Sequence, residues 1–228
     1  MNSPRPAVVN FPKWNLKVLL DYLESDAFEP LVEKSWEISR SKALILMMLA
    51  TGRRFEDIQA LQKWKLYRYN GSQFIRFRAY EGWKGKAVSS KSRWRPKPVV
   101  IYPISYSEGK DLSALCPLRA FRIFWEASKT KRAALGSPQR LWLHSTKPGG
   151  FLPSRVINVI KESMILASPL TPASDHPPVG THHLRKFSFS YAYIFGVCND
   201  VNQLWQRAGS KSGLVPLKSY IRDIPDIT

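Results

Sequence analysis

The sequence predicts a mainly α-helical domain that carries a small antiparallel β-sheet. Apolar residues recur with helical spacing in the first sixty residues and again after Cys116. Two segments between these regions, 73–80 and 98–104, have the composition of strands. With 228 residues, of which 44% are hydrophobic, the chain is large enough to bury one sizeable core.

Helices are expected wherever apolar residues return every three or four positions. Leu16, Leu19, Leu20 and Leu23 show this spacing, and the apolar second helix is expected to stop at Thr51-Gly52, because glycine readily ends a helix. The predicted helices are 15–23, 35–49, 55–61, 117–128, 154–167, 183–195 and 201–207. We also predict an N-terminal arm over 1–12, a short strand over 140–144 and a proline-rich connection over 170–180.

A basic segment joins the two predicted strands. Residues 73–80 alternate apolar and polar side chains, which is typical of a strand with one buried face. The connection to residues 98–104 carries six cations: Lys84, Lys86, Lys91, Arg93, Arg95 and Lys97. This pattern indicates a hairpin directed at phosphates, and the alternative is a hairpin that is only solvated.

The net charge of +18, from 35 Lys and Arg against 17 Asp and Glu, favours a polyanionic partner. Nucleic acid is favoured over a membrane surface, because no basic amphipathic helix stands out and the longest apolar run, 43–50, is too short to span a bilayer. The two cysteines and four histidines lack zinc-ligand spacing, so neither a metal nor another cofactor is expected. The N-terminus has no signal-peptide apolar region.

Three local patterns could carry chemistry. Arg54 follows an apolar helix and a small-residue turn, a position from which a guanidinium can bind phosphate oxygens in a bidentate manner. His182 and Arg185 are three positions apart and share one helix face, and Tyr220 lies among basic residues near the C-terminus. Each has a simpler interpretation: an Arg54–Asp57 ion pair, an ordinary loop histidine and an ordinary tyrosine.

Taken together, these patterns resemble the tyrosine recombinase (phage integrase) superfamily. The family shares the order of an arginine, a hairpin lysine, a His-x-x-Arg box and a C-terminal tyrosine. The amino-acid sequence is similar to those of the recombinases of DIRS-type retrotransposons over nearly the whole chain from about residue 11. Four stretches carry this likeness: 12–16 with 28–31, 53–61, 115–120 and 220–223.

The resemblance implies a role for each matching residue. Arg54 and Arg185 would grip the scissile phosphate, His182 would open the His-x-x-Arg box, and Tyr220 would be the nucleophile. For the lysine that protonates the leaving oxygen, Lys86 aligns best, followed by Lys84 and Lys91. Tyr191 and Tyr193 are the alternative nucleophiles. The residues expected to contact the DNA backbone are Arg53, Lys84, Lys91, Arg93, Arg95 and Lys186.

Asp57, Ser210 and Lys211 are the expected supporting residues. Ser210 occupies the position where relatives carry His or Trp. This departure implies either reduced catalytic activity or a role for Lys211 in the reaction. The resemblance further implies a catalytic domain over 13–228, without the family's preceding DNA-clamping domain. It also implies a double-stranded DNA partner and a dimer or tetramer assembled on that DNA. The expected location is the nucleus if the source is a eukaryote, and the cytoplasm or nucleoid if it is not.

Three other functions fit parts of the sequence. A catalytically decayed DNA-binding domain would explain Ser210, and a type IB topoisomerase would use the same chemistry to relax DNA. A basic scaffold or RNA-binding module would explain the charge alone, although no RNA-recognition signature is present.

Overall fold

A computed structural model describes residues 14–69, 72–83, 98–104, 113–136, 140–144 and 153–194 of the chain. Three predicted features lie outside these ranges: the arm 1–12, the basic segment between the strands and the helix 201–207. The elements follow the order α1 (Leu16–Glu24), η1 (Leu31–Glu33), α2 (Trp36–Thr51), α3 (Phe55–Gln59), β1 (Leu61–Tyr69), β2 (Ser72–Ala79), β3 (Val99–Ile101), α4 (Pro117–Ala127), α5 (Lys129–Ala134), α6 (Pro153–Ala167) and α7 (Thr181–Ile194).

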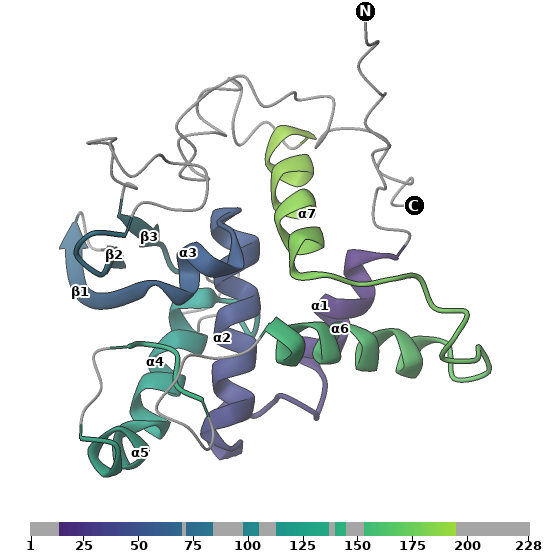
Figure 1. Cartoon of the computed structure of the whole chain (residues 1–228), viewed down its shortest axis with the longest axis horizontal. Helices are drawn as coiled ribbons and strands as arrows, with labels where there is room; N and C mark the ends of the chain where they lie inside the picture. The colour runs from purple at the N-terminus through teal and green to yellow at the C-terminus, as the bar shows by residue number, and fades with distance from the viewer. Residues whose placement is uncertain are drawn as a thin grey trace, which may run out of the picture.

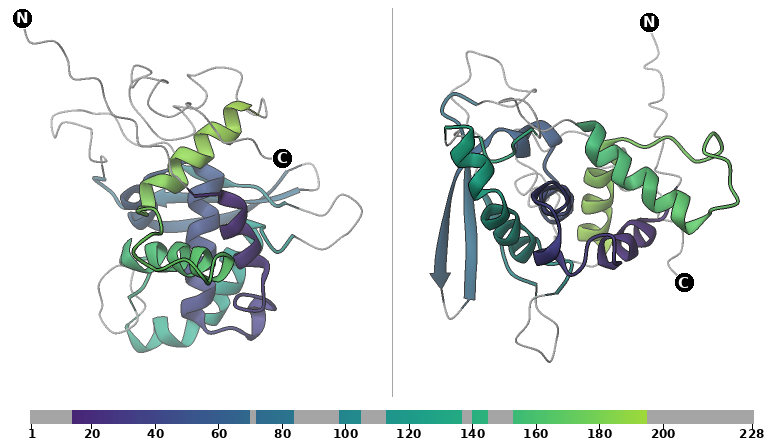
Figure 2. Two further views of the ribbon diagram at one scale, coloured as in Figure 1. Left: turned by 90° about the vertical axis from the view of Figure 1, so that its right-hand side faces the viewer. Right: turned by 90° about the horizontal axis from the view of Figure 1, so that it is seen from below.

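Helix α2 is the centre of the domain. Every residue from Ser39 to Met48 is buried, as expected for a helix that is covered on all sides. The sheet and α4 lie on one side of α2, and α1, α6 and α7 lie on the other (Figure 1). The right-hand view of Figure 2 looks along α2 and shows its neighbours arranged around it.

Local caps set the ends of the first two long helices. The Asn15 side chain accepts a hydrogen bond from the Lys17 amide, and Ser35 accepts one from the Ile38 amide. At the other end of α2, Gly52 adopts the left-handed conformation with φ 61° and donates its N–H to the Met48 carbonyl. The predicted helix boundaries are therefore confirmed to within about two residues here.

The sheet is antiparallel with the order β1-β2-β3. Ile75 and Phe77 of β2 point into the core, where Phe77 meets Phe121 of α4 edge to face at 4.8 Å. Trp64 of β1 lies opposite Phe77 and packs against Phe121 at 5.5 Å. The alternating pattern of β2 thus buries one face of the sheet against α4.

Five elements differ from the sequence prediction. The helix predicted over 55–61 ends at Gln59, and Leu61 already begins β1, a strand that was not predicted. The strand predicted over 140–144 is wrong: the segment holds only an isolated bridge at Leu143, because side chains fix it, with Arg132 and Arg40 donating hydrogen bonds to its carbonyls. Helices η1 and α5 were also not predicted.

Candidate active site

The site begins at the turn after α2. Gly52 approaches α7 so closely that a Cβ at this position would lie 3.1 Å from the Ser188 hydroxyl oxygen. With a positive φ and this contact, only glycine fits without strain. The turn therefore places Arg53 and Arg54 directly beside α7.

Arg185 joins this turn to α7. Its Nη1 donates a hydrogen bond of 2.8 Å to the Gly52 carbonyl, and its guanidinium lies 4.8 Å from the centre of the Phe189 ring. The side chain is only 1% exposed. A buried hydrogen bond and a cation–π contact hold the guanidinium in one orientation.

His182 lies one helical turn before Arg185, and the positive charges of both Arg54 and Arg185 act on its ring. Desolvation by burial and, after it, the positive charges of Arg185, Lys186 and Arg54 together lower its pKa to about 4. Part of the ring still reaches solvent. The histidine is therefore neutral at pH 7 although it stands among cations.

The structure thus brings Arg54, His182 and Arg185 together from two segments far apart in the sequence. Arg54 lies just before α3 in extended backbone and is half-buried. Within the described residues it forms no ion pair with Asp57, which was the simpler interpretation of that arginine. Lys186, the predicted backbone contact on α7, is half-buried, and burial lowers its pKa.

His183 has a different surrounding from His182. Trp14 donates its indole N–H to Nδ1 of His183 at 3.1 Å and packs edge to face on Phe187 at 4.8 Å. A ring nitrogen that accepts this bond belongs to a neutral imidazole, and burial accordingly lowers the pKa of His183. His183 therefore anchors the start of α7 to the N-terminal segment.

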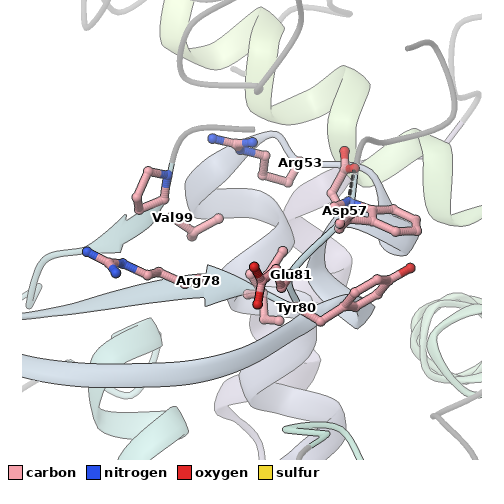
Figure 3. A pocket seen from close by; sticks show the side chains of 11 residues that line it. Arg53, Asp57, Arg78, Tyr80, Glu81 and Val99 are labelled. Carbon is pink, nitrogen blue, oxygen red and sulfur yellow. Dashed lines mark hydrogen bonds between the residues drawn. The ribbon is translucent and has the colours of Figure 1, made fainter. Parts of the chain in front are cut away.

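Arg53 is buried rather than exposed to solvent. It is 3% exposed and lines a pocket between α3 and the sheet together with Asp57, Arg78 and Glu81 (Figure 3). Burial lowers its pKa to about 10, and Arg185 lowers it too, while Asp57 raises it. Its predicted role as a DNA-backbone contact stays a prediction.

Asp57 connects the site to the basic segment. Its Oδ1 accepts a hydrogen bond of 3.3 Å from the Trp83 indole, drawn as a dashed line in Figure 3. Trp83 comes directly before Lys84 in the chain. Trp83 was not among the predicted site residues. Only its position next to the lysines of the basic segment could have indicated it.

Tyr191, an alternative nucleophile, lies on α7 and lines an apolar groove with Leu16, Leu20 and Phe187. Burial raises its pKa, which disfavours the phenolate that attack on phosphorus requires. The remaining predicted residues lie outside the described part of the chain, as does the Tyr193 side chain: Lys84, Lys86, Lys91, Arg93, Arg95, Ser210, Lys211 and Tyr220.

The described residues contain no group of three or more His, Cys, Asp or Glu side chains placed to hold a metal ion. None of the described helices combines the length and apolar character needed to cross a bilayer.

Comparison with solved structures identifies the fold. The chain is similar to the XerH site-specific recombinase bound to difH substrate in a pre-cleavage complex, with TM-score 0.52, 16% identity, and coverage of 90% of this chain and 48% of that one. It is also similar to XerH bound to palindromic difH substrate in a post-cleavage complex, with TM-score 0.56, 16% identity, and coverage of 93% and 49%. No family model and no curated protein matches the chain.

The fold is therefore that of a tyrosine recombinase catalytic domain, as the sequence predicted. The chain spans about half the length of these solved recombinases. In both solved structures XerH is bound to its difH substrate.

Proposed function

We propose that the protein cuts and rejoins DNA strands through a covalent phosphotyrosyl intermediate. The observation that carries the proposal is the hydrogen bond from Arg185 to the Gly52 carbonyl, which puts His182 and Arg185 of α7 beside the turn that carries Arg54. Two guanidinium groups and a neutral imidazole suit a reaction at a phosphodiester, where negative charge grows in the transition state. The net charge of +18 suits the duplex that carries this phosphate.

In the proposed reaction the Tyr220 oxygen attacks phosphorus, and the bond from phosphorus to the 5′ oxygen breaks. The phenol proton leaves to solvent, and the neutral His182 ring can accept a hydrogen bond from the phenol as it goes. Because a pKa of about 4 makes this imidazole a weak base, the positive charges of Arg54 and Arg185 are needed to favour the phenolate. The departing 5′ oxygen takes a proton from the hairpin lysine, assigned to Lys86 with Lys84 and Lys91 as alternatives. Arg54 and Arg185 stabilise the additional charge on the phosphoryl oxygens.

The products are a 3′-phosphotyrosyl bond and a free 5′ hydroxyl. Since the covalent bond conserves the energy of the phosphodiester, a 5′ hydroxyl can attack it and restore the strand without ATP. The phenolate of Tyr220 then leaves and recovers its proton. Exchange follows when the attacking hydroxyl belongs to another strand.

The experiment is a trapping assay with a nicked DNA substrate that loses its 5′ hydroxyl fragment after cleavage. The wild-type protein should form an adduct that resists denaturation, and Tyr220→Phe should bind the same DNA without forming it. Tyr191→Phe is the matched control and should still form the adduct. An adduct that persists in Tyr220→Phe and disappears in Tyr191→Phe would move the nucleophile to α7.

Ser210 favours a second candidate, a decayed domain that binds DNA without cutting it, because serine lacks the bulk of the His or Trp expected there. No adduct in wild type or either variant, with intact duplex binding, would support that candidate. Relaxation of supercoiled DNA without strand exchange would instead support a type IB topoisomerase. Within the cutting function, our finer proposals are a DIRS-like mobile element, integration of its DNA, a homo-oligomer on paired sites, and a nuclear location in a eukaryotic host.

A further inference from the structure

The outer face of the sheet carries a row of three aromatic rings, from β1, from β2 and from the residue just after β3. Ile75 and Ile101 point into the core, so their neighbours Phe74 and Tyr102 point outward. Tyr67 lies directly opposite Phe74, and their rings stack at 5.3 Å with an interplanar angle of 9°. Tyr102, just after β3, continues the row at 5.5 Å from Phe74.

One ring of the row is open to solvent. Phe74 has a ring on each side, and the Lys65 ammonium lies 5.5 Å from the centre of the Tyr67 ring. Tyr102 ends the row and is 62% exposed. A planar group can therefore stack on Tyr102 and extend an ordered series of rings, without the entropy cost of assembling them.

A row of cations runs beside the rings. Lys65 and Arg76 lie directly opposite each other across β1 and β2. Like charges in this position destabilise a sheet. No described carboxylate forms an ion pair with either of them, and the sequences of the three strands contain no Asp or Glu at all. Among the described residues this pair of cations therefore has no carboxylate partner, and a phosphate placed between them would relieve their repulsion.

The face is separate from the candidate active site. The end of β1 at Leu61 adjoins α3, whereas Tyr67 lies six positions along the strand, or ~20 Å away. Strands β1 and β2 extend away from α3 and α7 at the edge of the domain (Figure 2). A phosphate held by Arg54 and Arg185 therefore does not occupy this face.

We infer that the outer face of the sheet binds single-stranded nucleic acid, with a base stacked on Tyr102 and the backbone phosphates at Lys65 and Arg76. Aromatic rings beside cations suit a strand with unpaired bases, because every base offers a flat face for stacking. A duplex keeps its bases stacked on one another, so it offers only phosphates to this face. DNA and RNA strands share this chemistry.

The test measures fluorescence anisotropy of the full chain with labelled strands of about 12 nucleotides, an oligothymidine and an oligouridine, and with a duplex of equal length. Tyr102→Ala should weaken single-strand binding roughly 5- to 150-fold, as expected for the loss of one stacked base. Tyr102→Phe keeps the ring and should bind as the wild type does. Duplex binding should be unchanged in both variants.

A charge comparison completes the test. Arg76→Gln should weaken single-strand binding more than Lys129→Gln, which removes an equal charge from an exposed ion pair between α5 and α4. Circular dichroism should show that all variants are folded. Loss of the oligothymidine or the oligouridine complex in Tyr102→Ala supports the inference, and the tighter of the two assigns the strand. Equal affinities of Tyr102→Ala and wild type for both strands would overturn it.

Discussion

The Arg185 guanidinium donates a hydrogen bond of 2.8 Å to the carbonyl oxygen of Gly52, although the two residues are 133 positions apart. This bond ties α7 to the turn that presents Arg54. A shift at Gly52 therefore moves both arginines of the proposed phosphate site.

Gly52→Ala should lower the free energy of unfolding by about 1–2 kcal/mol, since alanine is strained at φ 61° and its Cβ would press on Ser188. Urea unfolding measures the change. Gly180→Ala is the control, because a Cβ there would have no neighbour within 4 Å. Equal stability of the two variants would contradict the close approach of α2 and α7.

Arg54→Ala should slow DNA cleavage by about 10²–10³-fold, the effect of removing one donor from a charged transition state. Duplex binding should largely survive, because the chain carries many other Lys and Arg residues that can neutralise phosphates. Single-turnover cleavage and anisotropy measure the two quantities. Arg122→Ala, on the exposed face of α4, should leave both nearly unchanged. Binding and cleavage that fall by the same factor in Arg54→Ala would argue against a role in the transition state.

His182 should titrate near pH 4 in the free protein, because burial and the neighbouring cations Arg185, Lys186 and Arg54 disfavour its charged form. Its NMR signals, assigned by their loss in His182→Gln, give this value directly. The unfolded chain takes up the proton first, near pH 6.5, so this histidine lowers stability as the pH falls from about 6.5 to 4. Above pH 6.5 it has no such effect. A titration midpoint at or above pH 6.5 would mean that His182 does not lie close to the arginines.

Trp83→Phe should slow cleavage roughly tenfold at saturating DNA, with little change in DNA affinity. The variant keeps an aromatic ring but loses the indole donor to Asp57, a bond to a charged group worth about 1.5–3 kcal/mol. Trp36→Phe, on the far end of α2, is the control and should cleave at the wild-type rate. A parallel loss of affinity and rate in Trp83→Phe would mean that Trp83 binds DNA and does not position the basic segment.

Glu29→Gln should destabilise the fold by about 3 kcal/mol, because it leaves the fully buried Lys42 ammonium without its anion. Burial acts to raise the pKa of Glu29, but hydrogen bonds from Arg119 and Lys42 outweigh it and lower the pKa to about 2. This stabilisation is present above pH 4.5 and is lost as the pH falls toward 2. Asp21→Asn breaks an exposed ion pair and should change stability by under about 0.5 kcal/mol.

Much of the fold follows from local patterns. Asn15, Ser35 and Gly52 mark helix ends through caps made within four residues, so neighbours in the sequence suffice to predict them. Strand β1 was missed because its lysines and aromatic residues become a two-faced pattern only once β2 lies beside it. The segment 140–144 looked like a strand because its apolar residues are buried, yet its backbone pairing stops at an isolated bridge at Leu143 and one hydrogen bond from Leu141 to Leu61.

The sequence by itself determined which side chains were candidates: the order of Arg54, His182, Arg185 and Tyr220, the excess of cations and the ends of the helices. The tertiary structure decided which of them meet. In it Arg53 is buried near Asp57, Arg185 donates a hydrogen bond to the Gly52 carbonyl, and Trp83 donates one to Asp57. The physical reason is range: caps and periodicity act over a few residues, whereas these contacts join segments that only packing around α2 brings together.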